Sequence, residues 1–526
     1  MTIPSVDLMF SMAEKYADAG DFARARTGYS RVLSLEPTHA DSMLQLSYLD
    51  SFAGRHRSAH EWLLRSLSGA LPARMRALVE TVQRLRTFNE LAELRAYCDR
   101  LLGSNVHYGV LLECARQLSI LNDYSRADAC LDAALRVAPQ DIGARLLHGQ
   151  FLANRGEVDS AAAEFEWVLA QNRANANAWW LLIRLRLQTA EQNHVSQLQA
   201  QLRAPGLTAG DVALLARALH KSLDDVGDYS GAWRALEVMC QARRSKIVYS
   251  ARTTRDLVDA LMSSHPDVVN APSARDDRKT PIFIVGMHRS GTTLLEQLMD
   301  ASDDVRGLGE LNDFSSALRY ETDHYSKHVL DIRTVALANG LDYASLGSGY
   351  MASVAPRLGH EAFFTDKQPA NFLNVGYICR ALPHAKILHL VRDPMETCFS
   401  NLRELFTEIN PYSYVQSELA DYFLQYRRLM AHWHHVYPGR ILDVSYSELT
   451  EMPEKTMRAV SGFCGIGYED GMQRTCTSSR PVSTASSVQI RGVVAKHRSA
   501  KWRPYAQVLA PLVTALHDAG LGATTE

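Results

Sequence analysis

The sequence predicts an all-α array of helical repeats in the N-terminal half, followed by an α/β domain built on a parallel sheet. Two patterns lead to this fold class. Glycine and alanine recur with a period of 34 residues up to about residue 240, which is typical of stacked helix pairs. Further on, two apolar strands each run into a loop and a helix, at residues 281–295 and 386–400. Strands that alternate with helices favour a parallel sheet.

The 34-residue period is clearest at the turn inside each predicted helix pair. Gly20 and Gly54 lie 34 residues apart, and each is followed five residues later by an alanine, where two helices would cross closely. The same register returns at Asn122 and Gly156, and Gly227 gives one more such pair after a short slip. The pattern resembles the tetratricopeptide repeat over about residues 5–240, with six units, although the segment at residues 74–107 fits it poorly.

Three regions follow from these patterns. They are the repeat array at residues 1–240, a helical connector and linker at residues 241–280, and the α/β domain at residues 281–526. Arrays of this type often bind a peptide or a protein segment on their concave side, so a partner of that kind is expected. The alternative is that the array only packs against the second domain or mediates self-association, as in a homodimer.

Composition excludes several classes of partner. The formal net charge of −2 provides no global field that would favour nucleic acid or an acidic membrane surface. No stretch approaches the ~20 apolar residues of a membrane span, and the eight cysteines include no Cys-x-x-Cys pair. Scattered cysteines are typical of free thiols in a reducing compartment. A cytoplasmic protein that binds neither membrane nor nucleic acid is expected.

The loop at residues 286–293 has the glycine spacing of a phosphate-binding P-loop, but threonine replaces the P-loop lysine. The pair Arg289-Ser290 lies inside the loop, and a helix is predicted to start near Ser290. Because the free N–H groups of that helix point at the loop, we expect it to bind a phosphate. A loop that lacks this lysine and magnesium is suited to holding a phosphate group, but not to cleaving the bond between the β- and γ-phosphates of a triphosphate.

The second strand–helix unit, Lys386–Val391 followed by Arg392-Asp393-Pro394, carries another cation. Asp393 is a suitable N-cap and Pro394 fits the first helical position. Arg392 is therefore predicted at the carboxyl end of a strand, where open α/β sheets bind ligands. Ser400 lies two helical turns further on, and together with Arg392 it is expected to hold a second phosphate. The alternative is a structural salt bridge between Arg392 and the helix cap.

Together these two motifs resemble the sulfotransferase superfamily. In that family the first loop holds the 5′-phosphosulfate of 3′-phosphoadenylyl sulfate (PAPS), and an arginine and a serine hold its 3′-phosphate. The resemblance covers about residues 281–510 and is closer to the protein-tyrosine sulfotransferases and their bacterial relatives with tetratricopeptide repeats. It implies that PAPS is the donor, that no metal is needed, and that the donor is bound by Arg289, Ser290, Gly291, Thr292, Thr293, Arg392, Ser400, Tyr446 and Lys501.

The same resemblance implies a catalytic set. Glu310, in Gly-Glu-Leu, takes the place of the family's catalytic base, and Lys367, in Asp-Lys-Gln-Pro, matches a lysine that steadies the transferring sulfuryl group. Ser486 and Lys501 match residues that close the nucleotide site, and Tyr446 matches a tyrosine near the adenine. A carboxylate base in this role is expected to be partly buried, with a raised pKa. One departure is that histidine stands at position 288, where the bacterial relatives usually have proline.

The resemblance implies PAPS-dependent transfer of a sulfuryl group to an acceptor hydroxyl. A tyrosine of a peptide or protein is the expected acceptor, because a phenol with a pKa of about 10 is easier to activate than an aliphatic alcohol. The alternatives are a small-molecule or glycan acceptor, and a non-catalytic repeat scaffold with a nucleotide-binding domain. The joint presence of Glu310, Lys367 and Ser486 argues against the scaffold, and the missing P-loop lysine argues against a kinase.

Three histidines near the end of a predicted helix, His432, His434 and His435, raise the question of a metal site. No cysteine or carboxylate completes a ligand set with them at the usual spacing. They are therefore interpreted as part of a solvated helix, and no metal site is predicted.

Overall fold

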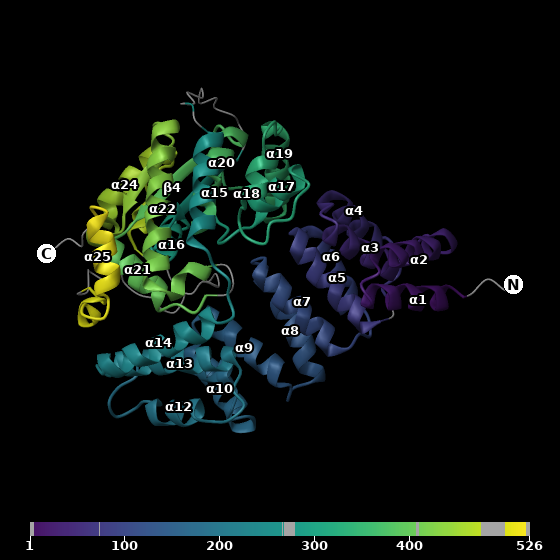
Figure 1. The fold of residues 1–526 in the computed structure, drawn as a ribbon, viewed down its shortest axis with the longest axis horizontal. Helices are drawn as coiled ribbons and strands as arrows, with labels where there is room; N and C mark the ends of the chain where they lie inside the picture. The colour runs from purple at the N-terminus through teal and green to yellow at the C-terminus, as the bar shows by residue number, and fades with distance from the viewer. Residues whose placement is uncertain are drawn as a thin grey trace. The chain divides into compact units, whose positions relative to one another are not determined.

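The computed structural model describes residues 5–72, 74–265, 267, 279–406, 410–474 and 500–521. The chain divides into two compact units, the first comprising residues 1–144 and 312–357 and the second residues 145–311 and 358–526. The first unit is all helical, and the second combines helices with a five-stranded sheet (Figure 1). The predicted fold class, a helical-repeat region followed by an α/β domain with a parallel sheet, is confirmed.

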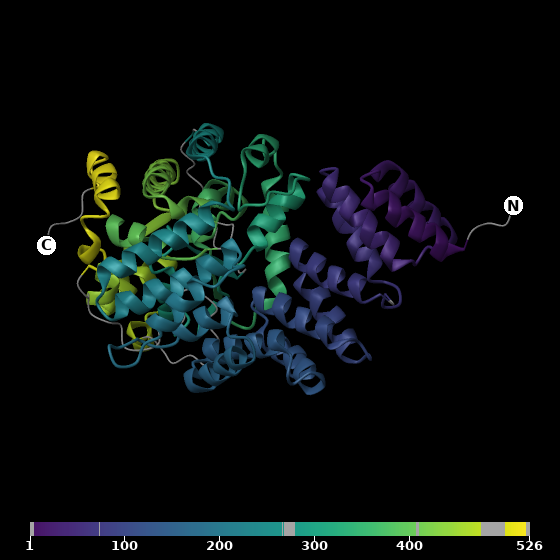
Figure 2. The same cartoon turned by 60° about the horizontal axis from the view of Figure 1, so that its bottom comes forward.

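Consecutive helices of the first unit pack side by side in pairs (Figures 1 and 2). In chain order they are α1 (Val6–Asp18), α2 (Phe22–Leu35), α3 (Ala40–Phe52), α4 (His56–Ser66), α5 (Met75–Phe88), α6 (Leu91–Leu102), α7 (Tyr108–Ile120) and α8 (Tyr124–Val137). The turns at Gly20, Gly54 and Asn122 have φ of 77°, 73° and 62°. This left-handed conformation favours glycine and asparagine, which explains the residue types at the repeat positions.

The poorly fitting segment also folds as a helix pair, α5 and α6. Its turn residue is Asn89, with φ of 63°, one residue later than the 34-residue period after Gly54 predicts. Five residues on, the close-crossing position is Leu94, which is fully buried. A shifted turn and a leucine in place of alanine therefore hid this pair in the sequence pattern.

Six helices of the second unit continue the pairs in chain order, and a seventh, α15, lies in the predicted connector. Their bounds are α9 (Ile142–Arg155), α10 (Val158–Gln171), α11 (Ala176–Ile183), α12 (Val195–Leu202), α13 (Ala209–Asp225), α14 (Tyr229–Arg244) and α15 (Ala251–Ser264). Gly156 and Gly227 take the left-handed turn conformation here. The predicted polar linker at residues 271–280 lies mostly outside the described residues, and the predicted domain boundaries remain a prediction.

A segment of the C-terminal half packs into the first unit. It contains α17 (Asp313–Glu321), α18 (Ile332–Leu337), α19 (Tyr343–Val354) and η1 (Ala355–Arg357). The Ser316 hydroxyl donates to the Phe88 carbonyl at 2.9 Å, and the Arg57 backbone N–H donates to the Asp323 carboxylate at 2.7 Å. Residues 312–357 thus form one body with the first repeats, although they are inserted between strands of the sheet.

The sheet of the second unit is entirely parallel, in the order β2-β3-β1-β4-β5. Its strands are β1 (Thr280–Gly286), β2 (Val305–Gly307), β3 (Phe363–Asp366), β4 (Lys386–Val391) and β5 (Ile441–Ser445). The chain fills the positions on one side of β1 first and then the positions on the other side. Ligands of open α/β sheets bind at such a switch point, outside the carboxyl ends of the strands.

Helices cover both faces of this sheet, as the unbroken apolar run in β1 predicts. Ile282 and Ile284 pack on one face with α16 (Thr292–Met299) and α24 (Pro453–Cys464). On the other face, α22 (Gln416–Val436) contacts β4 through a hydrogen bond between Tyr426 and His389. The remaining elements of the unit are η2 (Pro369–Asn374), α20 (Val375–Ala381), α21 (Pro394–Leu402), η3 (Pro411–Tyr414), α23 (Tyr446–Glu451), η4 (Asp470–Gln473), η5 (Arg503–Tyr505) and α25 (Ala510–Asp518).

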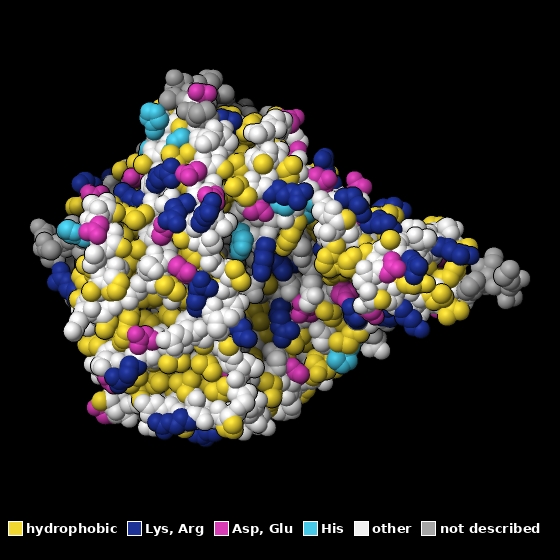
Figure 3. All heavy atoms as spheres, viewed as in Figure 1, with side chains coloured by type: hydrophobic (Ala, Val, Ile, Leu, Met, Phe, Trp, Pro, Cys, Tyr) yellow, Lys and Arg dark blue, Asp and Glu magenta, His cyan; other side chains and the backbone are white. Residues whose placement is uncertain are grey.

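The distribution of charged side chains and the state of the cysteines agree with what the composition predicts. Acidic and basic side chains are interspersed over the face shown in Figure 3, as the small net charge predicts. The seven cysteines within the described residues are buried and free, whereas Cys476 lies outside those residues. Among the described helices, none is both long and apolar enough to cross a bilayer.

Candidate functional site

The glycine-bounded loop connects β1 to α16 at the carboxyl edge of the sheet. Helix α16 begins at Thr292, two residues later than predicted, because Arg289 and Gly291 have φ of 67° and 106°, outside the right-handed helical region. Thr292 and Thr293 form the first turn, and both are buried. The free N–H groups of this turn face the loop, which makes it suitable for an anion.

Several enclosed polar atoms around the loop lack a hydrogen-bond partner. Ser290 Oγ is one of them, and others on or just after α21 are Glu396 Oε1, Thr397 Oγ1, Asn401 Oδ1 and Arg403 Nε, each without a partner among the residues that the structure describes. Buried polar groups in native proteins are nearly always satisfied by protein, water or ligand. Among these atoms Ser290 Oγ, Thr397 Oγ1 and Arg403 Nε can donate to an anion, whereas the oxygens of Glu396 and Asn401 can only accept.

Gly291 is the position in the loop that tolerates a side chain least. A Cβ atom there would lie 2.4 Å from Cδ2 of Tyr446, and the φ of 106° is strained for any other residue. Tyr446 is the first residue of α23, directly after β5. The close approach of loop and ring therefore requires glycine.

The substitution Gly291→Ala is expected to weaken binding of adenosine 3′,5′-bisphosphate by at least tenfold. Overpacking costs about 1–3 kcal/mol and the left-handed backbone about 1–2 kcal/mol, so the loop has to move. Calorimetry measures the affinity, with Gly462→Ala as control because its Cβ would meet no atom within 4 Å. Unchanged affinity in Gly291→Ala would show that the loop is not part of the donor site.

Arg392 lies at the carboxyl end of β4, as predicted. Asp393 caps α21 by accepting the Glu396 N–H at 2.8 Å, and Pro394 is the first helical residue. The Arg392 guanidinium donates to the Arg289 carbonyl at 3.1 Å and to the Glu396 carboxylate at 2.9 Å. The salt bridge of Arg392 is thus made with Glu396 in the first helical turn, rather than with the cap residue Asp393 as in the alternative. The guanidinium lies 4.6 Å from the centroid of the Tyr446 ring, so the motifs meet at one place.

Ser400 joins the same cluster from two turns along α21. Its hydroxyl accepts from Nε of Arg289 at 3.3 Å, so the serine of the second motif contacts the arginine of the first. Nε of Arg289 also lies 3.9 Å from Glu404. Two arginines and one serine from segments about a hundred residues apart are therefore assembled beside the loop.

Glu310 and Lys367 form an ion pair at the same edge of the sheet. The Lys367 ammonium donates to Glu310 Oε1 at 2.7 Å. Both residues follow the carboxyl ends of neighbouring strands, since β2 and β3 pair in parallel through Gly307 and Thr365. The lysine side chain is fully buried, whereas the glutamate is 45% exposed. A buried cation and a partly accessible carboxylate at this edge can serve charge stabilisation and proton transfer.

The pKa of Glu310 is lowered, opposite to the expectation for a catalytic base. Burial acts to raise it, but the charge and hydrogen bond of Lys367 outweigh burial, with smaller contributions from His288 and Arg289. The carboxylate is consequently ionised at neutral pH. It can accept a proton readily only when Lys367 is drawn to another anion.

A buried glutamate fixes the turn that carries Glu310. Glu296 of α16 accepts the backbone N–H of Gly309 at 2.8 Å and the hydroxyl of Thr365 at 2.8 Å. The Lys367 N–H in turn donates to the Gly309 carbonyl at 3.0 Å. The turns after β2 and β3 are therefore tied to each other and to the helix that follows the loop.

His288 lies within the electrostatic reach of the ion pair, and the sequence indicated it only as a departure from proline. Its Nδ1 lies 3.4 Å from the Tyr412 hydroxyl. Burial lowers the pKa of His288 to about 4, with Lys367 and Arg289 adding to the shift and Glu310 opposing it. The imidazole is therefore neutral near pH 7, and it can donate or accept a hydrogen bond there.

Arg217 and Glu404 are parts of the cluster that sequence reasoning missed. Arg217, on α13, pairs with Glu404 at 2.8 Å, and each side chain is only 11% exposed. The guanidinium also lies 4.4 Å from the centroid of the Trp180 ring. Glu404 could have been found four residues after Ser400, just beyond the end of α21, but no spacing relates Arg217 to the loop.

Two residues at the C-terminal end of the predicted site are Ser486 and Lys501. Ser486 lies outside the described residues. Desolvation lowers the pKa of Lys501, Arg403 and Arg392 lower it further, and Asp224 and Glu396 act to raise it. The contacts described above connect Arg289, Gly291, Arg392, Ser400 and Tyr446, and Ser290, Thr292 and Thr293 belong to the same loop and helix start.

Comparison with known proteins shows which proteins this domain is similar to. Residues 281–470 match the model of the sulfotransferase family. An uncharacterized protein of Aquifex aeolicus is 28% identical over 382 residues, covering 70% of this chain and 49% of the relative. Protein-tyrosine sulfotransferase 2 of Gallus gallus is 24% identical over 203 residues, covering 36% of this chain and 52% of the relative. The chain thus spans about half the length of these curated relatives.

The solved structures that align with part of this chain include a sulfotransferase domain and a tetratricopeptide repeat protein. The sulfotransferase domain of the Synechococcus PCC 7002 olefin synthase aligns with a TM-score of 0.32 and 19% identity, over 45% of this chain and 91% of that one. A tetratricopeptide repeat protein of Parabacteroides merdae aligns with a TM-score of 0.33 and 16% identity, over 45% of this chain and 98% of that one.

Proposed function

From the sulfotransferase-family domain at residues 281–470, we propose that this chain transfers a sulfuryl group from PAPS to an acceptor hydroxyl. The observation that carries the proposal is the pair of Glu310 and Lys367, 2.7 Å apart, at the sheet edge that also holds the loop of β1. A non-catalytic nucleotide-binding scaffold would not require a buried lysine and a carboxylate at this edge.

In the proposed mechanism, the chain's residues divide into donor-binding and reacting groups. Arg392 and Ser400 hold the 3′-phosphate, while the loop N–H groups, Arg289 and the threonines of α16 hold the 5′-phosphosulfate. Lys367 donates to the oxygens on which charge builds, and Glu310 takes the proton of the acceptor hydroxyl. The sulfur–oxygen bond to the donor phosphate breaks as the bond to the acceptor oxygen forms, which requires positioned charge and no metal.

The ion pair explains how Glu310 becomes a base. Before the donor binds, Lys367 keeps the pKa of Glu310 low. A bound sulfuryl group competes for the ammonium, so the carboxylate loses part of that stabilisation and its proton affinity rises. The base is therefore activated only when the donor is present.

For the acceptor, we propose a tyrosine of a peptide or protein that is bound with help from the repeats. The insertion at residues 312–357 begins two residues after Glu310, and it packs on the repeats through Ser316 and Asp323. The segment that follows the proposed base is thus attached to the part of the chain suited to protein binding. The similarity to protein-tyrosine sulfotransferases supports the same acceptor class.

The test is transfer of labelled sulfate from PAPS to matched peptides that differ only in carrying tyrosine, phenylalanine or serine. Transfer to the tyrosine peptide alone supports both parts of the proposal. Transfer only to a serine peptide, a glycan or a small phenol overturns the tyrosine-peptide acceptor but leaves sulfuryl transfer standing. Absence of transfer to any of these acceptors, with no binding of adenosine 3′,5′-bisphosphate, overturns the proposed activity itself.

A further inference from the structure

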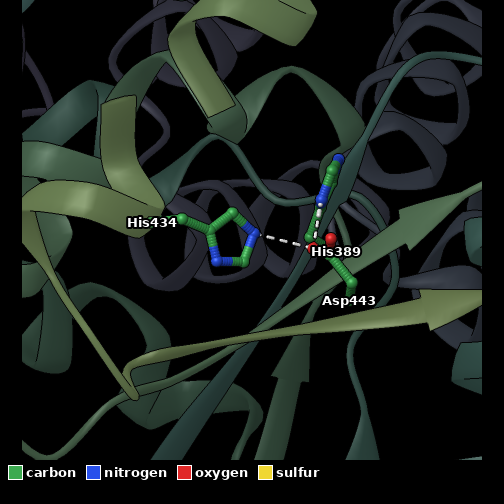
Figure 4. Close-up of side chains that lie close together, drawn as sticks. All are labelled: His389, His434 and Asp443. Carbon is green, nitrogen blue, oxygen red and sulfur yellow. Dashed lines mark hydrogen bonds and ion pairs between the residues drawn. The ribbon is translucent and has the colours of Figure 1, made fainter. Parts of the chain in front are cut away.

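Two histidines and an aspartate converge in the second unit, on the sheet face covered by α22 (Figure 4). His389 is on β4, Asp443 is its partner on β5, and His434 is in the last turn of α22. One potential ligand atom from each residue lies within 4.8 Å of the other two. The sequence grouped His434 with His432 and His435, whereas the fold pairs it with residues of two strands.

Both imidazoles are hydrogen-bonded to the same carboxylate oxygen. Nδ1 of His389 lies 2.7 Å from Oδ1 of Asp443, and Nε2 of His434 lies 2.8 Å from that oxygen. Two ring nitrogens and one carboxylate oxygen form the donor set that zinc and related divalent ions prefer. Ligand atoms of a tetrahedral zinc ion lie about 3.3 Å apart at bond lengths of about 2.0–2.1 Å. The two nitrogen–oxygen distances therefore need to lengthen by only about half an ångström.

The three side chains differ in solvent exposure in a way that suits reversible binding. His389 is 2% exposed, so the sheet holds it in place, while Asp443 and His434 are 53% and 37% exposed and can adjust. The exposure also leaves room for a water molecule as fourth ligand. An ion can therefore reach the cluster from solvent.

Tyr426 supplies the outer support that a ligating histidine requires. Its hydroxyl is hydrogen-bonded to Nε2 of His389, and the backbone of Met287 contributes a further hydrogen bond to that hydroxyl. A partner on the second ring nitrogen fixes both the ring orientation and the tautomer of a metal-bound histidine. For Nδ1 to carry a metal, Nε2 must hold the proton and donate it to the Tyr426 oxygen.

We propose that His389, His434 and Asp443 form a binding site for one divalent ion of the zinc class, which joins the end of α22 to β4 and β5. The site is separate from the Glu310–Lys367 pair, and sulfuryl transfer as proposed above does not need it. The role of the ion is structural, because it would crosslink a helix to two strands.

The test uses the full chain after removal of metals with a chelator, titrated with Zn²⁺ alone. The expected result is one ion per chain, with affinity at least tenfold lower in His434→Ala and in Asp443→Asn. Tyr426→Phe is expected to weaken binding about tenfold, as loss of an outer-shell partner does. His435→Ala is the matched control, since His435 neighbours His434 but lies outside the cluster.

A second readout separates binding at the cluster from binding elsewhere. Zn²⁺ should raise the melting temperature of the wild-type chain and of His435→Ala, but not of His434→Ala, because only a folded cluster binds the ion. Equal Zn²⁺ affinity in wild type and His434→Ala would overturn the proposal. So would a loss of affinity in His435→Ala as large as that in His434→Ala, or no binding by the wild-type chain.

Discussion

The substitution Glu310→Gln is expected to lower the rate of sulfuryl transfer by about 10²- to 10⁴-fold, the usual contribution of a positioned general base. Glutamine keeps the size of the side chain and a hydrogen-bonding oxygen for Lys367, but it cannot take the acceptor proton. Binding of adenosine 3′,5′-bisphosphate should change little, because the carboxylate faces the acceptor rather than the phosphates in the proposed mechanism. The measurement is single-turnover transfer of labelled sulfate.

Glu451→Gln provides the matched control for this experiment. Glu451 is an exposed carboxylate at the end of α23, so neutralising it should leave the rate unchanged. Full activity of Glu310→Gln would refute the assignment of the base. A loss of bisphosphate affinity as large as the loss of rate would instead move Glu310 into the donor-binding set.

The substitution Lys367→Met is expected to lower the transfer rate by about 10²- to 10³-fold, comparable to removal of one preorganised donor to a developing charge. Methionine fills a similar volume, so the buried site should stay packed. The loss should appear in kcat more than in bisphosphate affinity, because the ammonium serves the sulfuryl group during transfer. An equal loss in both quantities would assign Lys367 to donor binding alone.

The pH profile distinguishes this electrostatic role from a loss of structure. In the wild-type chain the pKa of Glu310 is lowered, so kcat/KM should stay constant from neutral pH downward and fall only below the ordinary range of a glutamate, about 4.3. In Lys367→Met, burial acts without its opposing cation, so the acidic limb should move to higher pH. An acidic limb at the same pH in both chains would contradict the coupling of the pair.

The sequence predicted those parts of the fold that depend on local patterns. Turn glycines with left-handed φ, a buried run ending at Val285 and the Asp393 cap all act within one or two turns of chain. Their structural consequences are therefore visible in a single sequence. The bounds of β4 were predicted without error, because an apolar run is closed there by the Arg-Asp-Pro turn.

The parts that the sequence did not predict depend on contacts between distant segments. The packing of residues 312–357 with the first repeats, the pairing of Arg217 with Glu404, and the meeting of His389 with His434 all need the tertiary fold. The prediction that the pKa of Glu310 is raised was wrong for the same reason. Burial alone would raise it, but the lysine that lowers it is 57 residues away in sequence.

The central claim is that the lysine-free loop after β1 holds a 3′-phosphorylated nucleotide without metal. The direct measurement is calorimetry of the full chain with adenosine 3′,5′-bisphosphate in the presence of chelator, and with ATP in the presence of magnesium. We expect the bisphosphate to bind without metal and at least tenfold more tightly than ATP with magnesium. Tighter binding of ATP with magnesium, or no binding of the bisphosphate, would contradict it.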